Sequence, residues 1–216
     1  MPLSLFQVDA FTSKVFRGNP AAVVPLDVWL SDKVMLAIAA ENNLSETAFF
    51  VPAESVDVDF HLRWFTPTVE VDLCGHATLA SAYVLFNQLG WISDVIRFSS
   101  KTGSLFAERD GDGVILDFPS QTTAKAPCPD GLEMALGQRV VGYWQAEKAV
   151  ALLDDEAAVR AARPDMQFVA ALPSDGLIIT AKGTDCDFVS RYFAPASGID
   201  EDPVTGSAHC ILAPFW

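Results

Sequence analysis

The sequence lacks the cysteine and histidine patterns of a metal or disulfide site. It has no CxxC pair, and its 216 residues include only four cysteines and three histidines. Neither the usual ligand spacing of zinc nor a disulfide framework is therefore predicted. A Walker loop and a GxGxxG motif are also missing, so the sequence predicts that no metal and no nucleotide binds.

Basic residues are scarce. Fourteen Lys and Arg face 28 Asp and Glu, which gives a formal net charge of −14. A nucleic-acid-binding protein needs clustered basic residues to neutralise phosphates, so this class is excluded. A small anionic substrate is not excluded, because local dipoles can bind an anion inside an acidic protein.

Long apolar runs are missing too. No stretch of about 18 apolar residues occurs that could span a membrane. The start, MPLSLFQVDAF, lacks the basic region and cleavage site of a signal peptide. We therefore expect a cytoplasmic protein without a membrane partner.

Strand-like and helical patterns alternate along the chain and predict an α+β protein. Half of the residues are hydrophobic, which suffices for a sizeable core. The proline-containing segment 120–130 has no apolar periodicity, and we interpret it as a linker between domains 1–119 and 131–216. Each half places strands before an apolar helix. The first of these helices is expected from about 75 to 89, and the second is expected to begin at about 206. We further expect a strand near 166–172 and a loop over 195–206.

The two apolar helices have similar starts. DLCGHAT at 72–78 and DPVTGSA at 202–208 both begin with an acid and enter the helix through glycine, at Gly75 and Gly206. The first turn of a helix carries backbone N–H groups without intrahelical partners, and these groups bind anions. Glycine lets a ligand approach them closely. Ordinary helix capping by Asp72 and Asp202 is the alternative interpretation.

Residues suited to proton transfer lie at or near these starts. His76 directly follows Gly75, and histidine is the side chain with an ordinary pKa closest to neutrality. Pro203 favours an extended conformation for Asp202, which would hold that carboxylate outside the helix. Glu46 begins an otherwise apolar strand, and packing into an apolar cleft would raise its pKa, as a general acid/base requires. Each residue taken alone is more typical of a structural role.

Four short stretches occur in one order along the chain: GNP at 18–20, LSET at 44–47, GHAT at 75–78 and EDPVTGS at 201–207. Together they resemble the phenazine-biosynthesis-like (PhzF-like) isomerase family, which has the diaminopimelate epimerase-like fold. The resemblance covers the whole chain. It implies two pseudo-duplicated domains, each a curved, mostly antiparallel sheet around a central helix, with the active site in the cleft between them.

The resemblance also implies roles. Glu46 matches the general acid/base of an isomerase that needs no cofactor and acts on a small carboxylic acid. His76, Asp202 and Ser207 match residues that assist proton movement and hold the substrate. The residues expected to bind or support the substrate are Asn19, Ser45, Gly75 and Gly206.

Two departures from related enzymes leave alternatives open. Racemases of this fold use two cysteines, one at each helix start. Here Cys74 directly precedes Gly75, but no cysteine stands at the helix start before Gly206. An epimerase that uses Cys74 with a different partner is one alternative, and a catalytically silent member that binds an acid or a protein is another. Family members also continue beyond the second central helix, whereas this sequence ends at Trp216. We therefore expect either a fragment or a second chain that covers the gap, as in a homodimer.

Overall fold

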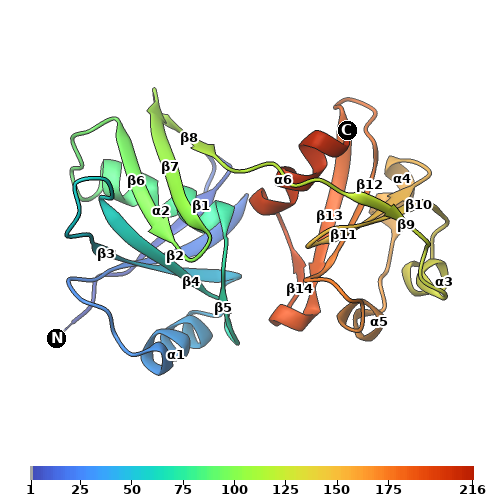
Figure 1. Ribbon diagram of the computed structural model, residues 1–216, viewed down its shortest axis with the longest axis horizontal. Helices are drawn as coiled ribbons and strands as arrows, with labels where there is room; N and C mark the ends of the chain where they lie inside the picture. The colour runs from blue at the N-terminus through green and yellow to red at the C-terminus, as the bar shows by residue number, and fades with distance from the viewer. Residues whose placement is uncertain (1) are drawn as a thin grey trace. The chain divides into compact units, whose positions relative to one another are not determined.

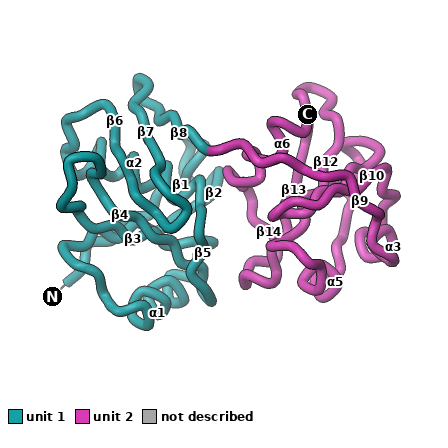
Figure 2. The backbone as a smooth tube through the Cα atoms, viewed as in Figure 1, with its two compact units in different colours: residues 1–118 teal, residues 119–216 magenta. Residues whose placement is uncertain are grey.

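The computed structural model describes residues 2–216 and divides into two compact units. Unit 1 comprises residues 1–118 and unit 2 residues 119–216, shown in different colours in Figure 2. The segment 120–130, interpreted above as a linker, contains the short strand β9 (Ala124–Ala126) of unit 2. Within the described residues, no helix is long and apolar enough to cross a membrane.

The described part of unit 1 forms a sheet of eight strands. They are β1 (Phe6–Ala10), β2 (Asn19–Pro25), β3 (Glu46–Pro52), β4 (Phe60–Phe65), β5 (Glu70–Val71), β6 (Val95–Ser100), β7 (Gly103–Asp110) and β8 (Gly113–Asp117). Their order is β1-β2-β3-β4-β6-β7-β8, and β5 pairs with β4. The β2–β3 and β4–β6 pairs are parallel and the other pairs antiparallel. A tight turn at 110–113 joins β7 to β8.

Helix α2 (Gly75–Asn87) lies inside this curled sheet (Figure 1). It contacts β1, β2 and β3 and also β8, so strands from both ends of the sheet order reach one helix. Its sequence, GHATLASAYVLFN, is apolar on almost every side, which is typical of a helix that is buried all round. The predicted start at Gly75 is confirmed, and Gly90, with φ of 72°, follows its end.

Both faces of β3 are buried, which explains its nearly continuous apolar run. Ala48 and Phe50 belong to the core around α2. Phe49 and Val51 face the other way, into a second core that includes Met35 of α1 (Asp32–Asn42). Because successive side chains of a strand point to opposite faces, one strand serves both cores.

The described part of unit 2 holds a six-stranded sheet in the order β14-β13-β12-β11-β10-β9. Besides β9, its strands are β10 (Val140–Gln145), β11 (Ala149–Leu153), β12 (Leu177–Lys182), β13 (Phe188–Ala194) and β14 (Ile199–Asp202). The β11–β12 pair is parallel and the others antiparallel. One core includes residues of α3 (Leu132–Leu136), α4 (Glu156–Ala161) and α5 (Met166–Ala170), and the other includes residues of α6 (Gly206–Phe215).

Two expectations for unit 2 were wrong. The strand expected near 166–172 is helix α5, because the Asp165 side chain accepts hydrogen bonds from the backbone N–H groups of Gln167 and Phe168 and so caps a helix. The expected loop 195–206 contains a 3₁₀ turn (Pro195–Ser197) and β14, which pairs with β13.

Helix α6 begins at Gly206, as predicted, and contains Pro214. Proline has no backbone N–H, so the carbonyl of Cys210 cannot receive the usual bond from four residues further along. The backbone N–H of Gln121 donates to this carbonyl instead, at 2.8 Å. This hydrogen bond attaches the first residues of unit 2 to α6.

Candidate active site

The candidate site in unit 1 lies where β3 and α2 begin. Glu46 is the first residue of β3 and pairs with Ala21 of the parallel strand β2. Cys74 is the N-cap of α2, and His76 lies in the first turn. Glu46, Cys74 and His76 are all buried, with relative exposures of 9%, 4% and 2%. The sheet register and the start of the helix thus bring Glu46 to Cys74 and His76, a pair about 30 residues further along the sequence.

The His76 ring lies between the other two side chains. Its Nε2 is 3.4 Å from Glu46 Oε2, and its Nδ1 is 3.4 Å from Cys74 Sγ. Burial lowers the pKa of His76 to about 4, so the imidazole is neutral near pH 7. A neutral imidazole donates through one nitrogen and accepts through the other. The ring thus contacts a thiol through one nitrogen and lies near a carboxyl group through the other.

The other site residues predicted for unit 1 lie near these two starts. Asn19 is fully buried at the first position of β2, two residues before the partner of Glu46. Ser45 is half-buried and directly precedes Glu46, and Gly75 is the buried first residue of α2. The side chain of Asn42 donates to Thr47 Oγ1 at 3.1 Å, which links the end of α1 to the start of β3.

Unit 2 holds the remaining predicted residues around the start of α6. Asp202 ends β14 and is buried, so the extended conformation expected before Pro203 is confirmed. Thr205 Oγ1 donates to Asp202 Oδ2 at 2.5 Å. Gly206 and the buried Ser207 are the first two residues of α6. Within each unit, the predicted residues therefore gather where a glycine opens the central helix.

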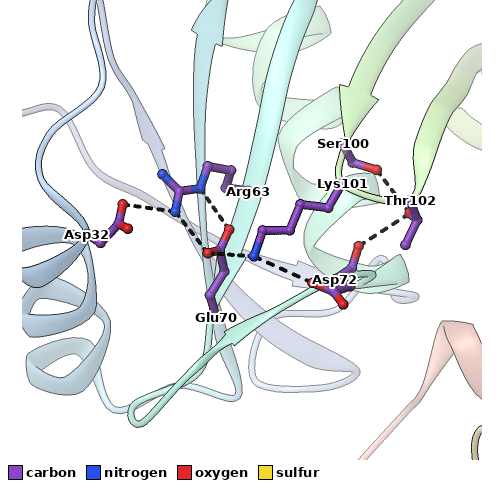
Figure 3. Close-up of polar contacts among 7 residues, drawn as sticks. All are labelled: Asp32, Arg63, Glu70, Asp72, Ser100, Lys101 and Thr102. Atoms are coloured by element: carbon purple, nitrogen blue, oxygen red, sulfur yellow. Dashed lines mark hydrogen bonds and ion pairs between the residues drawn. The ribbon is translucent and has the colours of Figure 1, made fainter.

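A network of ion pairs, which no sequence motif indicated, lies beside the segment that leads into α2 (Figure 3). Arg63 of β4 donates from Nε to Glu70 Oε1 at 2.8 Å and from Nη2 to Glu70 Oε2 at 2.9 Å. Its Nη2 also donates to Asp32 Oδ1 at 3.0 Å. Lys101 Nζ lies 2.9 Å from Glu70 Oε2 and 3.6 Å from Asp72 Oδ1. The network ties β5 and residue 72 to the sheet just before Cys74.

A separate groove of about 600 Å³ lies elsewhere in unit 1. It is lined by β1, the loop that follows β1, one side of α2 and the β7–β8 turn, and includes Phe11, Leu79 and Tyr83. None of the predicted site residues lines it. The chemistry of the candidate site therefore does not depend on this groove.

Comparisons with known proteins agree with the resemblance inferred from the sequence. The family model described as "Phenazine biosynthesis-like protein" matches residues 8–216. A Pseudomonas aeruginosa protein named as an uncharacterized isomerase is 50% identical over 216 residues, which are 100% of this chain and 82% of that protein. Half of the residues are thus shared with a relative across the whole of this chain.

Solved structures support the same assignment. The crystal structure of a PhzF-family phenazine biosynthesis protein from Enterococcus faecalis is 44% identical, with a TM-score of 0.90, and the match covers 100% of this chain and 82% of that one. A Pseudomonas aeruginosa structure described as a predicted epimerase is 20% identical, with a TM-score of 0.72 over 98% of this chain and 80% of that one. At 20% identity, the likeness to this second structure shows the fold alone. That fold is the expected α+β, diaminopimelate epimerase-like fold. The chain therefore belongs to the phenazine biosynthesis-like (PhzF-like) family.

Proposed function

We propose that this chain is a cofactor-independent isomerase that moves a proton within a small carboxylic acid, with Glu46 as the proton carrier. The observation that carries the proposal is the buried Glu46 carboxyl group 3.4 Å from the buried, neutral His76. Relatives of high identity that are named isomerases support the reaction class.

In this proposal Glu46 takes a proton from one carbon of the substrate and returns it to another. General acid/base catalysis needs a group that changes its protonation state within reach of the reacting atom. His76 is suited to pass a proton to or from Glu46, because its neutral ring both donates and accepts.

The remaining predicted residues would hold the substrate. The first-turn N–H groups of α2 at Gly75 are suited to a carboxylate. We assign support of the substrate to Ser45, which directly precedes Glu46, and to Asn19 at the start of β2. We assign the corresponding part in unit 2 to Gly206, and we assign assistance in proton movement to Asp202 and Ser207. These assignments rest on the family resemblance and on the burial of Asp202 and Ser207.

The test is proton exchange at carbon. Metal-free protein is incubated in deuterated water with a panel of small amino acids and unsaturated carboxylic acids, and NMR follows deuterium uptake. Glu46→Gln keeps the shape of the side chain but cannot carry the proton, so the exchange rate should fall at least about 10²-fold. Glu41→Gln, an exposed position in α1, is the matched control and should retain the rate. Equal rates in the two variants would refute the role of Glu46.

A second candidate is an epimerase that uses Cys74. The observation in its favour is the 3.4 Å distance between Cys74 Sγ and His76 Nδ1, which would allow the ring to activate the thiol. Exchange that survives Glu46→Gln and is lost in Cys74→Ser would favour this candidate. Exchange that is lost in Glu46→Gln and survives in Cys74→Ser would favour the proton carrier proposed above.

A further inference from the structure

Three side chains at the start of α2 have the donor atoms that zinc prefers. Cys74 offers a sulfur, His76 a ring nitrogen and Glu46 a carboxylate oxygen, and one such atom from each lies within 4.8 Å of the others. All three side chains are buried, unlike the exposed acidic groups that commonly occur without an ion. This combination is that of a three-ligand transition-metal site.

The distances suit one ion after small side-chain movements. A tetrahedral zinc ion lies about 2.3 Å from sulfur and about 2.0–2.1 Å from nitrogen, which sets these two donors roughly 3.5 Å apart. Cys74 Sγ and His76 Nδ1 are 3.4 Å apart. Glu46 Oε2 lies 3.4 Å from Nε2 of His76, which is the ring nitrogen that does not face Cys74. To join an ion bound to Nδ1, the Glu46 side chain has to rotate toward the Nδ1 side of the ring. Three protein ligands would leave the fourth position of the ion open.

The donor set also selects among metals. Thiolate and imidazole are ligands of zinc, cobalt and related ions, whereas magnesium and calcium prefer oxygen donors. Zinc would displace the thiol proton of Cys74 to solvent, and its two positive charges would be balanced by one thiolate and one carboxylate. The ion would thus be neutralised by its ligands within a buried setting.

We propose that Cys74, His76 and Glu46 bind one zinc-type ion, and that this ion inhibits the protein by occupying the proton carrier. Metal binding stands on the geometry alone, and only the inhibition rests on the proposed function. Sequence spacing predicted no metal because Glu46 is distant from the Cys74-x-His76 pair in the chain. The fold supplies the third ligand.

Cobalt is the probe, because Co²⁺ takes the place of zinc and its bond to a thiolate gives a strong ultraviolet absorption. The chain has four cysteines, so the background variant is Cys128→Ser/Cys186→Ser/Cys210→Ala, which keeps Cys74 as the remaining thiol. Titration with Co²⁺ should give the thiolate absorption, saturating at one equivalent, in both the wild-type chain and this background. Magnesium in excess should not displace the cobalt, whereas zinc should.

The decisive variants change one ligand each. Cys74→Ser in the otherwise natural chain should abolish the absorption, and serine is favourable at a helix N-cap, so folding should be retained. Glu46→Gln should keep the absorption but weaken cobalt binding at least about tenfold, since a ligand is lost. Circular dichroism verifies the fold of each variant.

Two results would overturn the metal site. One is a background variant that shows no thiolate absorption, and the other is absorption that persists in Cys74→Ser. The proposed function fails separately, through the deuterium-exchange assay on metal-free protein. Exchange that is unaffected by one equivalent of zinc, in a protein that binds cobalt as described, would overturn the inhibition.

Discussion

Replacing Glu70 by glutamine should weaken unit 1 through the ion-pair network beside α2. The Glu70 carboxylate accepts two parallel bonds from Arg63 and lies 2.9 Å from Lys101 Nζ. Glutamine keeps the size of the side chain but offers only one oxygen and no charge. One bond of the Arg63 pair is therefore lost and the other becomes weaker.

The size of the loss follows from exposure. Hydrogen bonds to charged groups contribute about 1.5–3 kcal/mol when buried, and exposed ion pairs about 0–1 kcal/mol. Arg63 and Glu70 have side-chain exposures of 22% and 17%, between these limits. We expect Glu70→Gln to lower the free energy of unfolding by about 1–2 kcal/mol. Asp32→Asn is the matched control: Asp32 binds the same arginine but is 76% exposed, so it should cost below about 0.5 kcal/mol.

The loss should also depend on pH. The hydrogen bonds from Arg63 are the largest cause that holds the pKa of Glu70 below its ordinary value of 4.5. Above pH 4.5 the carboxylate is ionised in both folded and unfolded chains, and its full contribution is present. As the pH falls further, the unfolded chain takes up the proton first, and the contribution is lost as the pH passes through the folded pKa. The difference between wild type and Glu70→Gln should therefore shrink in acid.

Hydrogen exchange of peptides from residues 60–87 is the suitable assay, because the two compact units need not unfold together. The measurement compares wild type, Glu70→Gln and Asp32→Asn at pH 7 and in acid. Equal costs for the two variants, or a Glu70→Gln cost that does not change with pH, would refute the reasoning.

Two further predictions concern single positions. Gly18→Ala should lower the free energy of unfolding by at least about 3 kcal/mol, because Gly18 has a φ of +70° and an added Cβ would meet the Ala10 carbonyl oxygen at 2.0 Å. Gly90→Ala is the control: Gly90 has a φ of +72° but no described atom within 4 Å of such a Cβ, so the loss should be only about 1–2 kcal/mol. Equal urea midpoints for the two variants would contradict this prediction. Thr205→Val should cost about 1–3 kcal/mol by removing the hydroxyl that donates to buried Asp202, whereas Thr205→Ser should retain stability, as measured by hydrogen exchange over residues 199–215.

Local patterns in the sequence predicted the helices and strands where they were unambiguous. Glycine at positions 75 and 206, followed by apolar residues, predicted both central helices at the residues where they begin. The segment 166–172 was misassigned because a short apolar run suits a strand as well as a buried helix. Asp165 decides the outcome by capping α5, and Val169 and Leu172 then pack into the core of unit 2.

The contacts of the site could not be predicted, because they depend on strand register. Glu46 reaches His76 only because β3 runs parallel to β2 in one register and α2 returns to the same end of the sheet. The Arg63–Glu70 pair depends in the same way on the pairing of Phe65 with Glu70. A shift of one residue would turn Glu46 to the other face of β3. Residue types alone could therefore propose candidate residues for the site but give none of its distances.

At both central helices the N-cap side chain contacts a candidate proton-transfer residue. The N-cap side chains of α4 and α5, Asp155 and Asp165, accept bonds from first-turn N–H groups, as caps usually do. In the described structure, the N-cap side chains of α2 and α6 make no such bond, and neither does Ser31 at the N-cap of α1. Cys74 lies against His76 instead, and Thr205 donates to Asp202. Each central helix thus directs its capping side chain to a candidate proton-transfer residue. Its first-turn N–H groups remain uncapped by that side chain, as the binding of a substrate carboxylate would require.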